Sequence, residues 1–300
     1  MSKEIKRPNF IIIGAMKAAT TSLYTYLKQH PAVFMTKVKE PMFFNNYKQD
    51  NNYKIMGPKK SKKFVFNQYL DLFDDARDET AIGEASPSYI YNHQAPALIK
   101  EKLPDVKIIA ILRQPTDRAY SNFLHARRAG KEPLSSFEDS IKEEDRRIED
   151  NWSPLYHYIN KGYYTKQLER YYSVFPQDKI KVILFEDIVK SPQKTIRDIF
   201  NFLKVDSYQE IDFSNKANVS GDPKGILGWI VKKMRFYNIM PGNLLSRLPS
   251  FMRFFLYKLA YSNPKKMDKD LRKNITNRYY LDEIKKLEKM IDRDLSHWLG

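Results

Sequence analysis

The sequence contains no cysteine, and this absence excludes several kinds of chemistry at once. Without thiols the chain cannot form disulfides, thiolate zinc sites or iron–sulfur clusters, and it cannot use a cysteine nucleophile. The five histidines share no metal-ligand spacing, and no H-E-x-x-H motif occurs, so we expect no metal site. No stretch of about 18 apolar residues is present, so the sequence predicts no membrane-spanning helix.

An export signal is also missing from the N-terminal region. Its apolar stretch, Phe10 to Ile13, is too short for the core of a signal peptide, so we expect a cytoplasmic chain. The 300 residues include 42% hydrophobic and 29% charged residues, which is typical of a globular protein with a well-buried core.

Acidic residues are too few to balance the basic ones. The 52 lysines and arginines exceed the 36 aspartates and glutamates, giving a formal net charge of +16, which points to an anionic partner. Residues 226–267 contain eight basic residues and no acidic one. This region fits peripheral contact with an acidic membrane surface or an acidic glycan, or a helical cap with a lysine-rich solvent face. No nucleic-acid-binding motif is present, so we expect no nucleic-acid partner.

Short β-branched runs alternate with helical patterns along the chain. We expect strands at Asn9–Ile13, Lys107–Leu112 and Lys179–Phe185. We expect helices at Thr20–Gln29, Pro115–Arg128, Tyr163–Tyr172 and Pro192–Leu203, the first of them capped by Thr20 or Thr21. This alternation predicts an α/β fold with a parallel sheet, which binds ligands at the carboxyl ends of its strands.

The first strand is followed by a loop that is typical of phosphate binding, because it opens a helix and exposes backbone N–H groups to an anion. Its residues are Gly14, Ala15, Met16, Lys17, Ala18, Ala19, Thr20, Thr21 and Ser22. A Walker A loop would carry its lysine at the position of Thr20, whereas here the lysine is Lys17. This spacing disfavours a kinase or an ATPase, although a phosphotransferase that uses ATP remains an alternative.

Two further segments carry candidate chemistry. Lys39-Glu40-Pro41-Met42-Phe43-Phe44 can hold a carboxylate rigidly at a cleft, where it would serve as a general base, or can simply form a turn. Arg113 ends the strand Lys107–Leu112, so its planar guanidinium points to the ligand-binding edge and suits bidentate phosphate binding. Ser121 lies about two turns into the helix that follows.

Together the three segments resemble signatures of the sulfotransferase superfamily that uses 3′-phosphoadenosine 5′-phosphosulfate (PAPS), in particular its heparan sulfate-type and bacterial carbohydrate sulfotransferase branch. The loop resembles GxxKxGTT/S-x-L, with Ala19 where the family commonly has glycine. The second segment resembles KEPxFF, and Arg113 to Ser121 resembles R-x-P-x-x-R-x-x-S. Gly83 to Tyr89 resembles GExTPxY, with Ala85 where several relatives carry lysine.

The resemblance implies a P-loop-like three-layer α/β fold with a central parallel sheet flanked by helices. We also expect a PAPS-binding domain over residues 1–225, followed by a basic helical C-terminal extension over residues 226–300 that packs on the same domain. The reaction would be sulfuryl transfer from PAPS to a hydroxyl of a carbohydrate or glycolipid, with adenosine 3′,5′-bisphosphate as product and no metal. A non-catalytic basic module that binds acidic lipid or nucleic acid remains the other alternative.

The resemblance also assigns roles to residues. Glu40 would be the catalytic base, and Lys17 would neutralise the charge that grows on the bridging oxygen. The loop with Lys17 would hold the 5′-phosphate, and Arg113 with Ser121 would hold the 3′-phosphate. Lys224 would contact the phosphates of PAPS from a late loop. The acceptor side would include Lys37, Lys39 and His125, whereas Arg118 would be structural, paired with Asp117 or Glu84.

Overall fold

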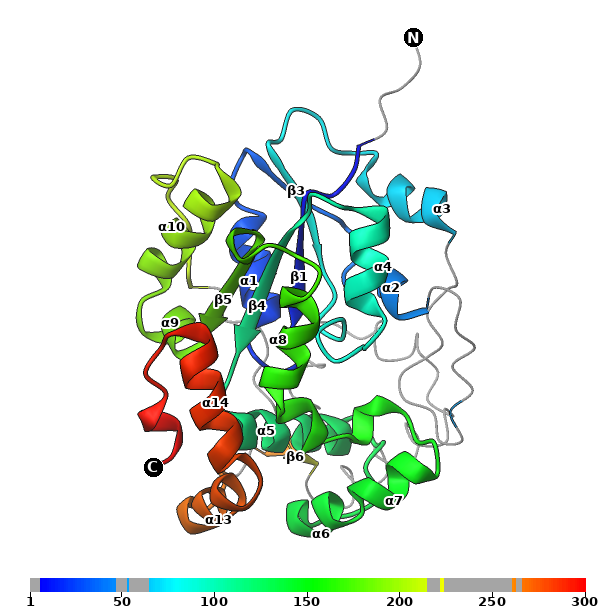
Figure 1. Ribbon diagram of the computed structural model, residues 1–300, viewed down its shortest axis with the longest axis vertical. Coiled ribbons are helices and arrows are strands. Elements are labelled where there is room, and N and C mark those ends of the chain that lie inside the picture. Colours follow the sequence, from blue (N-terminus) through cyan, green and yellow to red (C-terminus); the bar gives the residue numbers. More distant parts are fainter. Residues whose placement is uncertain (1–5, 47–52, 54–64, 215–221, 224–260, 263–265) are drawn as a thin grey trace.

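The computed structural model describes residues 6–46, 53, 65–214, 222–223, 261–262 and 266–300 of the chain. A five-stranded sheet with the order β2-β3-β1-β4-β5 forms its centre (Figure 1). Every neighbouring pair in this sheet is parallel. The strands are β1 (Phe10–Gly14), β2 (Val33–Met35), β3 (Ala81–Ala85), β4 (Lys107–Leu112) and β5 (Ile180–Leu184).

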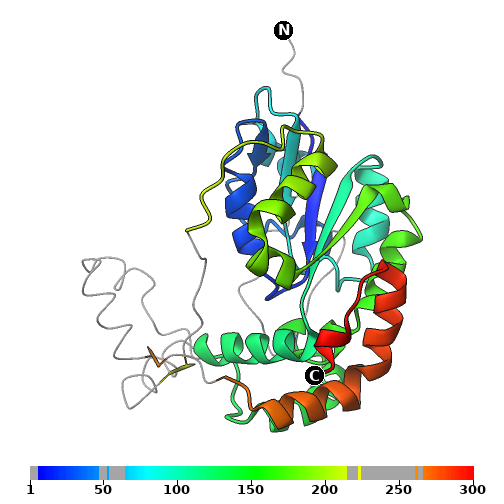
Figure 2. The same ribbon diagram turned by 90° about the vertical axis from the view of Figure 1, so that its left-hand side faces the viewer.

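Helices cover both faces of the sheet, which buries its central strands. All five residues of β1 are buried, as are five of the six residues of β4, and such continuous apolar runs are typical of a parallel sheet enclosed between helices. One face carries α1 (Thr20–Leu27) and α10 (Pro192–Leu203), and the other carries α4 (Ala95–Lys102) and α8 (Tyr164–Tyr172) (Figures 1 and 2). The structure therefore confirms the three-layer α/β fold.

The helix α5 (Pro115–Arg128) runs across the carboxyl end of the sheet (Figure 1). Pro115 at its first position has no backbone N–H, so no hydrogen-bond partner is needed there. The side chain of Gln114 caps the helix by accepting a hydrogen bond from the amide of Asp117 at 2.6 Å. This helix therefore forms the floor beneath the strand ends where a ligand would bind.

The remaining helices of the described part lie around this frame. They are α2 (Phe43–Asn46), α3 (Phe66–Leu70), α6 (Phe137–Lys142), α7 (Glu144–Glu149), α9 (Phe185–Lys190), α13 (Lys269–Ile275) and α14 (Leu281–Ile291), with a π-helical turn at Thr276–Tyr280. Short 3-10 turns occur at Asp71–Phe73, Pro154–Tyr156, Asn160–Gly162, Gln177–Lys179 and Ser296–Trp298. Two short strands, β6 (Asp222–Pro223) and β7 (Tyr261–Ser262), pair antiparallel.

Several elements have the bounds that the sequence predicted, among them β4, α5 and α10. The expected cap of α1 was wrong. Ala19, with a left-handed φ of 67°, is the N-cap residue, and no side chain caps the helix. Thr20 and Thr21 instead lie within its first turn, so their side chains do not occupy the helix amides.

Some expectations concern residues outside the described part of the chain. Lys224 lies there, as does almost all of the basic region 226–267 and the expected domain boundary at 225. Among the residues that are described, no helix is both long and apolar enough to cross a membrane.

The C-terminal segment from α13 to Trp298 packs against the strand ends. Arg272 of α13 forms a two-point ion pair with Asp117 in the first turn of α5, with nitrogen–oxygen distances of 3.0 and 3.3 Å. The side chain of Gln114 donates to the hydroxyl of Thr276 at 2.9 Å and to the carbonyl of Trp298 at 3.1 Å. Trp298 is fully buried, and its indole N–H donates to Glu186 at 3.2 Å. The segment thereby connects the ends of β4 and β5.

We expect Trp298→Ala to lower the free energy of unfolding by about 3–5 kcal/mol, because it empties a buried site and leaves Glu186 without its indole donor. Denaturant titration followed by circular dichroism would measure the change. Tyr208→Ala is the control, since this side chain is 81% exposed and its loss should change stability by no more than about 0.5 kcal/mol. Equal effects of the two substitutions would contradict the role of Trp298.

Candidate functional site

The loop after β1 turns sharply into α1 at the carboxyl edge of the sheet. Gly14 has a φ of +156°, and a Cβ atom there would lie 2.5 Å from Ile90 Cγ2 and 2.9 Å from the carbonyl oxygen of Pro87. Only glycine therefore fits where β1 ends. The amide of Ala15 still donates to Ile111 of β4 at 2.7 Å, so the start of the loop remains tied to the sheet.

Two residues of this loop adopt the left-handed conformation, Lys17 with a φ of 70° and Ala19 with a φ of 67°. Turns of this kind direct successive backbone N–H groups toward one concave site, and the first turn of α1 adds amides that have no intrahelical partners. Glycine adopts this left-handed conformation more readily than alanine, yet Ala19 has it here. The loop is therefore built to receive an anion such as a phosphate.

Lys17 lies among other charged groups in the loop. Its pKa is lowered to about 8, mainly by burial and also by the charges of Arg128, Arg113 and Lys39, whereas Glu40 opposes this shift. Three cations and one carboxylate thus act on a single half-buried lysine. Such an arrangement favours an anionic ligand, because an anion would relieve the mutual repulsion of the cations.

Glu40 follows β2 on a segment with unusual backbone geometry. Glu40 and Met42 both have left-handed φ values, 56° and 53°, on either side of Pro41. Burial raises the pKa of Glu40, while Lys39 and Lys17 oppose that shift. A carboxylate with a raised pKa is a better proton acceptor than an exposed one, which suits the work of a general base.

The two lysines before Glu40 have different surroundings. Lys39 donates to the hydroxyl of Thr21 at 2.7 Å, which ties this segment to the phosphate loop. Lys37 instead forms an exposed ion pair with Asp75 at 2.6 Å. The structure therefore brings Lys39 to the loop, whereas Lys37 is directed toward Asp75.

Arg113 lies directly after β4 and reaches the phosphate loop. Its guanidinium donates to the carbonyl of Lys17 at 3.1 Å and lies 4.6 Å from the ring centroid of Phe185. Its own carbonyl accepts a hydrogen bond from the hydroxyl of Tyr164 at 2.8 Å. These contacts fix both the backbone and the side chain of Arg113. Ser121 is half-buried on α5, the helix that follows.

His125 lies one turn after Ser121 on the same helix. Its pKa is lowered to about 4, mainly by burial and also by the charges of Lys17, Arg128 and Lys161. Its Nδ1 atom is buried and has no hydrogen-bond partner within the described residues. The ring is therefore neutral at pH 7. It can form a hydrogen bond with a ligand but contributes no charge.

Sequence reasoning missed two cations of this group, Lys161 and Arg128. Lys161 is buried, its ammonium donates to the sulfur of Met16 at 3.7 Å, and burial lowers its pKa to about 7. Arg128, the last residue of α5, acts on both Lys17 and His125. Because neither residue lies within a segment that suggests anion binding, no signal in the sequence distinguishes them from surface cations.

Arg118 is buried within the fold, as its expected structural role requires. Its expected pairing with Asp117 or Glu84 was wrong. Its side chain is fully buried and donates to the carbonyl of Tyr158. Asp117 pairs with Arg272 instead, and Glu84 accepts its hydrogen bonds from hydroxyl groups. Arg118 thus connects α5 to the segment before α8.

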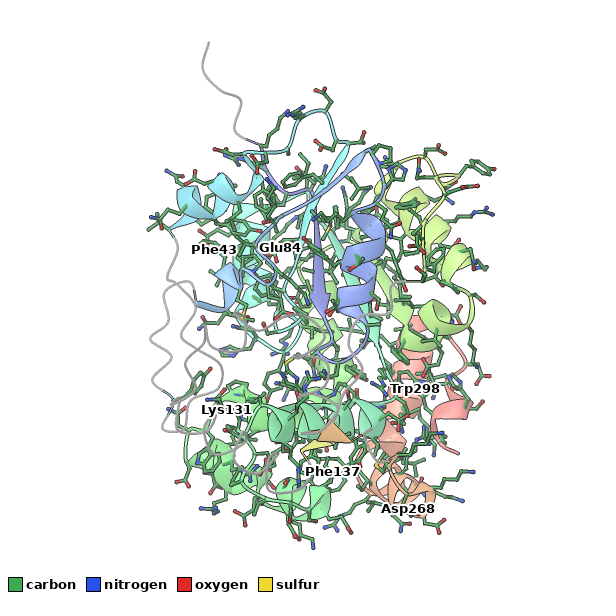
Figure 3. All side chains as sticks on the ribbon, turned by 180° about the vertical axis from the view of Figure 1, so that it is seen from behind. Phe43, Glu84, Lys131, Phe137, Asp268 and Trp298 are labelled. Atoms are coloured by element: carbon green, nitrogen blue, oxygen red, sulfur yellow. The ribbon has the colours of Figure 1, made fainter. Side chains whose placement is uncertain are left out.

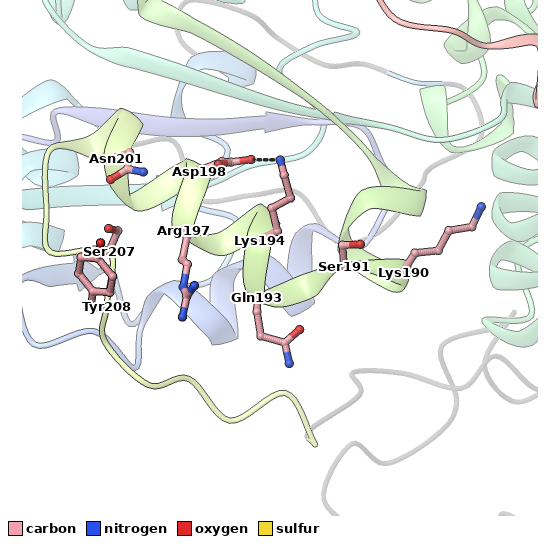
Figure 4. Close-up of a pocket in the computed structure, with 9 residues that line it drawn as sticks. All are labelled: Lys190, Ser191, Gln193, Lys194, Arg197, Asp198, Asn201, Ser207 and Tyr208. Carbon is pink, nitrogen blue, oxygen red and sulfur yellow. Dashed lines mark hydrogen bonds and ion pairs between the residues drawn. The ribbon is translucent and has the colours of Figure 1, made fainter.

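A separate open pocket of about 530 Å³ lies on the outer side of α10 (Figure 4). Its lining comes from α9, α10 and the loop that follows, and includes Lys190, Lys194 and Arg197. Asp198 pairs with Lys194 at 2.9 Å within it. None of the phosphate-loop residues lines this pocket, so it is not an extension of the site at the strand ends.

The chain is similar in sequence and in fold to several known proteins. The model of the sulfotransferase domain family matches residues 7–224. A sulfotransferase of known structure from Alicyclobacillus acidocaldarius is 30% identical, with a TM-score of 0.77 over 99% of this chain and 100% of that chain. Mouse (Mus musculus) heparan sulfate glucosamine 3-O-sulfotransferase 3A1 is 31% identical over 200 residues, which are 65% of this chain and 45% of that protein.

A third relative is the membrane-associated sulfotransferase kil1 of Dictyostelium discoideum, which is 25% identical over 319 aligned residues. This match includes 80% of the present chain and 65% of the relative. The chain therefore spans only part of the length of these curated relatives, from 45% to 65%.

The charge state of Lys17 should control binding of adenosine 3′,5′-bisphosphate. Because its pKa is about 8, Lys17 is protonated below pH 8, and affinity should fall as the pH rises from 7.5 to 9.5 by up to about tenfold per unit. Isothermal titration calorimetry would measure this dependence.

Lys17→Arg should flatten the dependence on pH, because arginine stays charged throughout this range. The control Lys28→Arg alters an exposed lysine and should leave the profile unchanged. An affinity that does not vary with pH in the unsubstituted protein would contradict contact between Lys17 and the ligand.

Proposed function

The chain belongs to the family of PAPS-dependent sulfotransferases, and we propose that it transfers the sulfuryl group of PAPS to a hydroxyl group of a carbohydrate or glycolipid. One observation above all supports the proposal. The phosphate loop places the cation Lys17 where the charges of Arg113 and the carboxylate Glu40 act on it, so anion binding and proton removal can occur at one site.

The described residues fit PAPS. The left-handed turns at Lys17 and Ala19 and the start of α1 suit a 5′-phosphate, and the fixed guanidinium of Arg113 suits a 3′-phosphate. When bound, PAPS supplies the sulfuryl group. Ser121 would add a hydroxyl donor to the 3′-phosphate, and this second phosphate is what distinguishes PAPS from ATP.

Each residue of the site has a distinct task in the proposed reaction. The oxygen of the acceptor hydroxyl attacks sulfur while the carboxylate of Glu40 takes the hydroxyl proton. The S–O bond to the 5′-phosphate breaks in the same step. The ammonium of Lys17 stabilises the negative charge that grows on the departing oxygen. The half-buried Arg128 and the buried Lys161 reinforce the positive potential around the loop.

The acceptor class rests on the kinship with carbohydrate sulfotransferases. The relatives include an enzyme named for the glucosamine of heparan sulfate, which is the source of the carbohydrate proposal. We assign Lys39 to the acceptor side because its ammonium lies beside the loop at Thr21. We assign His125 there because its ring is neutral and the charge of Lys17 acts on it. A membrane-associated relative makes contact with a membrane surface a further proposal, and we retain a cytoplasmic location as a prediction.

Calorimetric titration with adenosine 3′,5′-bisphosphate, beside ATP with Mg²⁺, tests the donor. We expect micromolar or tighter binding of the bisphosphate and weak binding of ATP, whereas a preference for ATP would overturn the proposal. Arg113→Ala should weaken bisphosphate binding by about 10- to 100-fold through the loss of charge-assisted hydrogen bonds. Binding of adenosine 5′-monophosphate should change far less, and equal losses for both ligands would contradict the 3′-phosphate role of Arg113.

Glu40→Gln should lower turnover by about 10²- to 10⁴-fold, because glutamine cannot accept the proton of the hydroxyl. Affinity for the bisphosphate should stay within about twofold, since Glu40 is not a phosphate ligand. Turnover would be measured as transfer of radiolabelled sulfate from PAPS to a panel of heparosan, chondroitin and galactosylceramide. Glu138→Gln, at an exposed site on α6, is the control, and full activity of Glu40→Gln would rule out the base assignment.

A further inference from the structure

Glu84 is a buried carboxyl group to which the proposed reaction gives no task. It lies in β3, is 0% exposed, and burial raises its pKa to about 7. Its hydrogen bonds come from hydroxyl groups, at 2.7 Å from Ser86 and at 3.3 Å from Tyr69. An acidic residue in the core needs such donors, because burial without them is strongly unfavourable.

Ser86, which is also 0% exposed, connects Glu84 to the segment that carries Glu40. Its oxygen accepts a hydrogen bond from the amide of Met42 at 3.0 Å. A serine hydroxyl has one hydrogen to donate, and here that hydrogen goes to Glu84. The carboxyl group therefore orients the hydroxyl so that its lone pairs face Met42.

The same part of the structure holds the neighbouring residues of this segment. The hydroxyl of Tyr89 accepts a hydrogen bond from the amide of Phe44 at 3.3 Å. The ring of Phe43 stacks on Tyr69, with centroids 4.7 Å apart, and Figure 3 labels Phe43 beside Glu84. Glu40 and Met42 nevertheless keep left-handed backbone angles that non-glycine residues rarely adopt. Such angles persist where the surroundings enforce them.

We propose that Glu84 is a positioning residue for Glu40, acting through the Ser86 hydroxyl and the Met42 amide. The inference rests on the proposed function, because it assumes that Glu40 is the base. Glu84 itself does not reach the reacting atoms in this scheme. It holds the hydrogen-bond chain that keeps the Glu40–Met42 turn in place, and a small displacement of a base can lower turnover about 100-fold.

The first test replaces Ser86 by alanine, which removes the link but adds no bulk. We expect kcat to fall by about 10- to 100-fold, measured with the panel acceptor on which the unsubstituted enzyme is fastest. The Kd for adenosine 3′,5′-bisphosphate should stay within about twofold. Hydrogen exchange at the Met42 amide, followed by mass spectrometry of the peptides around it, should accelerate on the order of tenfold.

Ser140→Ala is the matched control. Ser140 is likewise fully buried, but its hydroxyl donates to the carbonyl of Ser136 at 2.8 Å at the start of α6. This variant should keep both kcat and the exchange rate at Met42. Ser86→Thr retains the hydroxyl and should restore most of the kcat that Ser86→Ala loses.

Glu84→Gln and the double variant Glu84→Gln/Ser86→Ala test whether the two residues act in one chain. Glu84→Gln should lower kcat without loss of bisphosphate affinity, and the double variant should be no slower than Ser86→Ala, because the link is already broken. Independent, multiplicative losses would overturn the proposal.

The remaining outcomes also decide the matter. A normal kcat for Ser86→Ala, or a loss of bisphosphate affinity that matches the loss of kcat, would overturn the positioning role. If Glu40→Gln is inactive while Ser86→Ala is fully active, only this inference fails. If Glu40→Gln is fully active, the proposed base fails, while faster exchange at Met42 in Ser86→Ala would still report the hydrogen bond.

Discussion

The site is governed by an excess of positive charge at the carboxyl edge of the sheet. The charges of Arg113, Arg128 and Lys39 lower the pKa of Lys17, and the carboxylate of Glu40 raises it. Lys161 is buried and donates to the sulfur of Met16 in the loop. Burial lowers the pKa of both lysines, and the charges of neighbouring cations contribute to each shift. The repulsion between these cations makes folding less favourable. A bound polyanion would relieve that repulsion, which would favour its binding.

The rest of the fold holds this arrangement in place. Arg113 is secured by Phe185 and Tyr164, so its orientation depends on the ends of β5 and on α8. The C-terminal segment adds a second layer, because Trp298 bonds to Glu186 next to Phe185. An element more than a hundred residues away in sequence therefore supports Arg113.

The sequence predicted those parts of the fold that local pattern determines. The apolar run of β4, Pro115 at the start of α5 and Pro192 at the start of α10 are local signals, and these elements have the predicted bounds. The cap of α1 was mispredicted because a left-handed Ala19 is a property of the loop geometry. Glycine is the residue that usually indicates such geometry, and Ala19 stands in its place here.

The candidate site was predictable to the same extent. Lys17, Glu40 and Arg113 lie in segments with recognisable spacing, and the structure brings their charges together. Arg128 and Lys161 join them only through tertiary packing, as do the hydroxyl groups around Glu84. Residues that act from a second layer depend on contacts between distant segments, and periodicity along the chain carries no information about those contacts.

The opposite pKa shifts of Lys17 and Glu40 have a common origin and a common consequence. Burial lowers the pKa of the lysine and raises that of the glutamate, so each group is less strongly charged than it would be in water. When a polyanion occupies the loop, its negative charge raises both pKa values. Lys17 then holds its proton more firmly, as a charge-stabilising group should, and Glu40 becomes a stronger base. Binding of the anionic donor would thus prepare both residues for their proposed tasks.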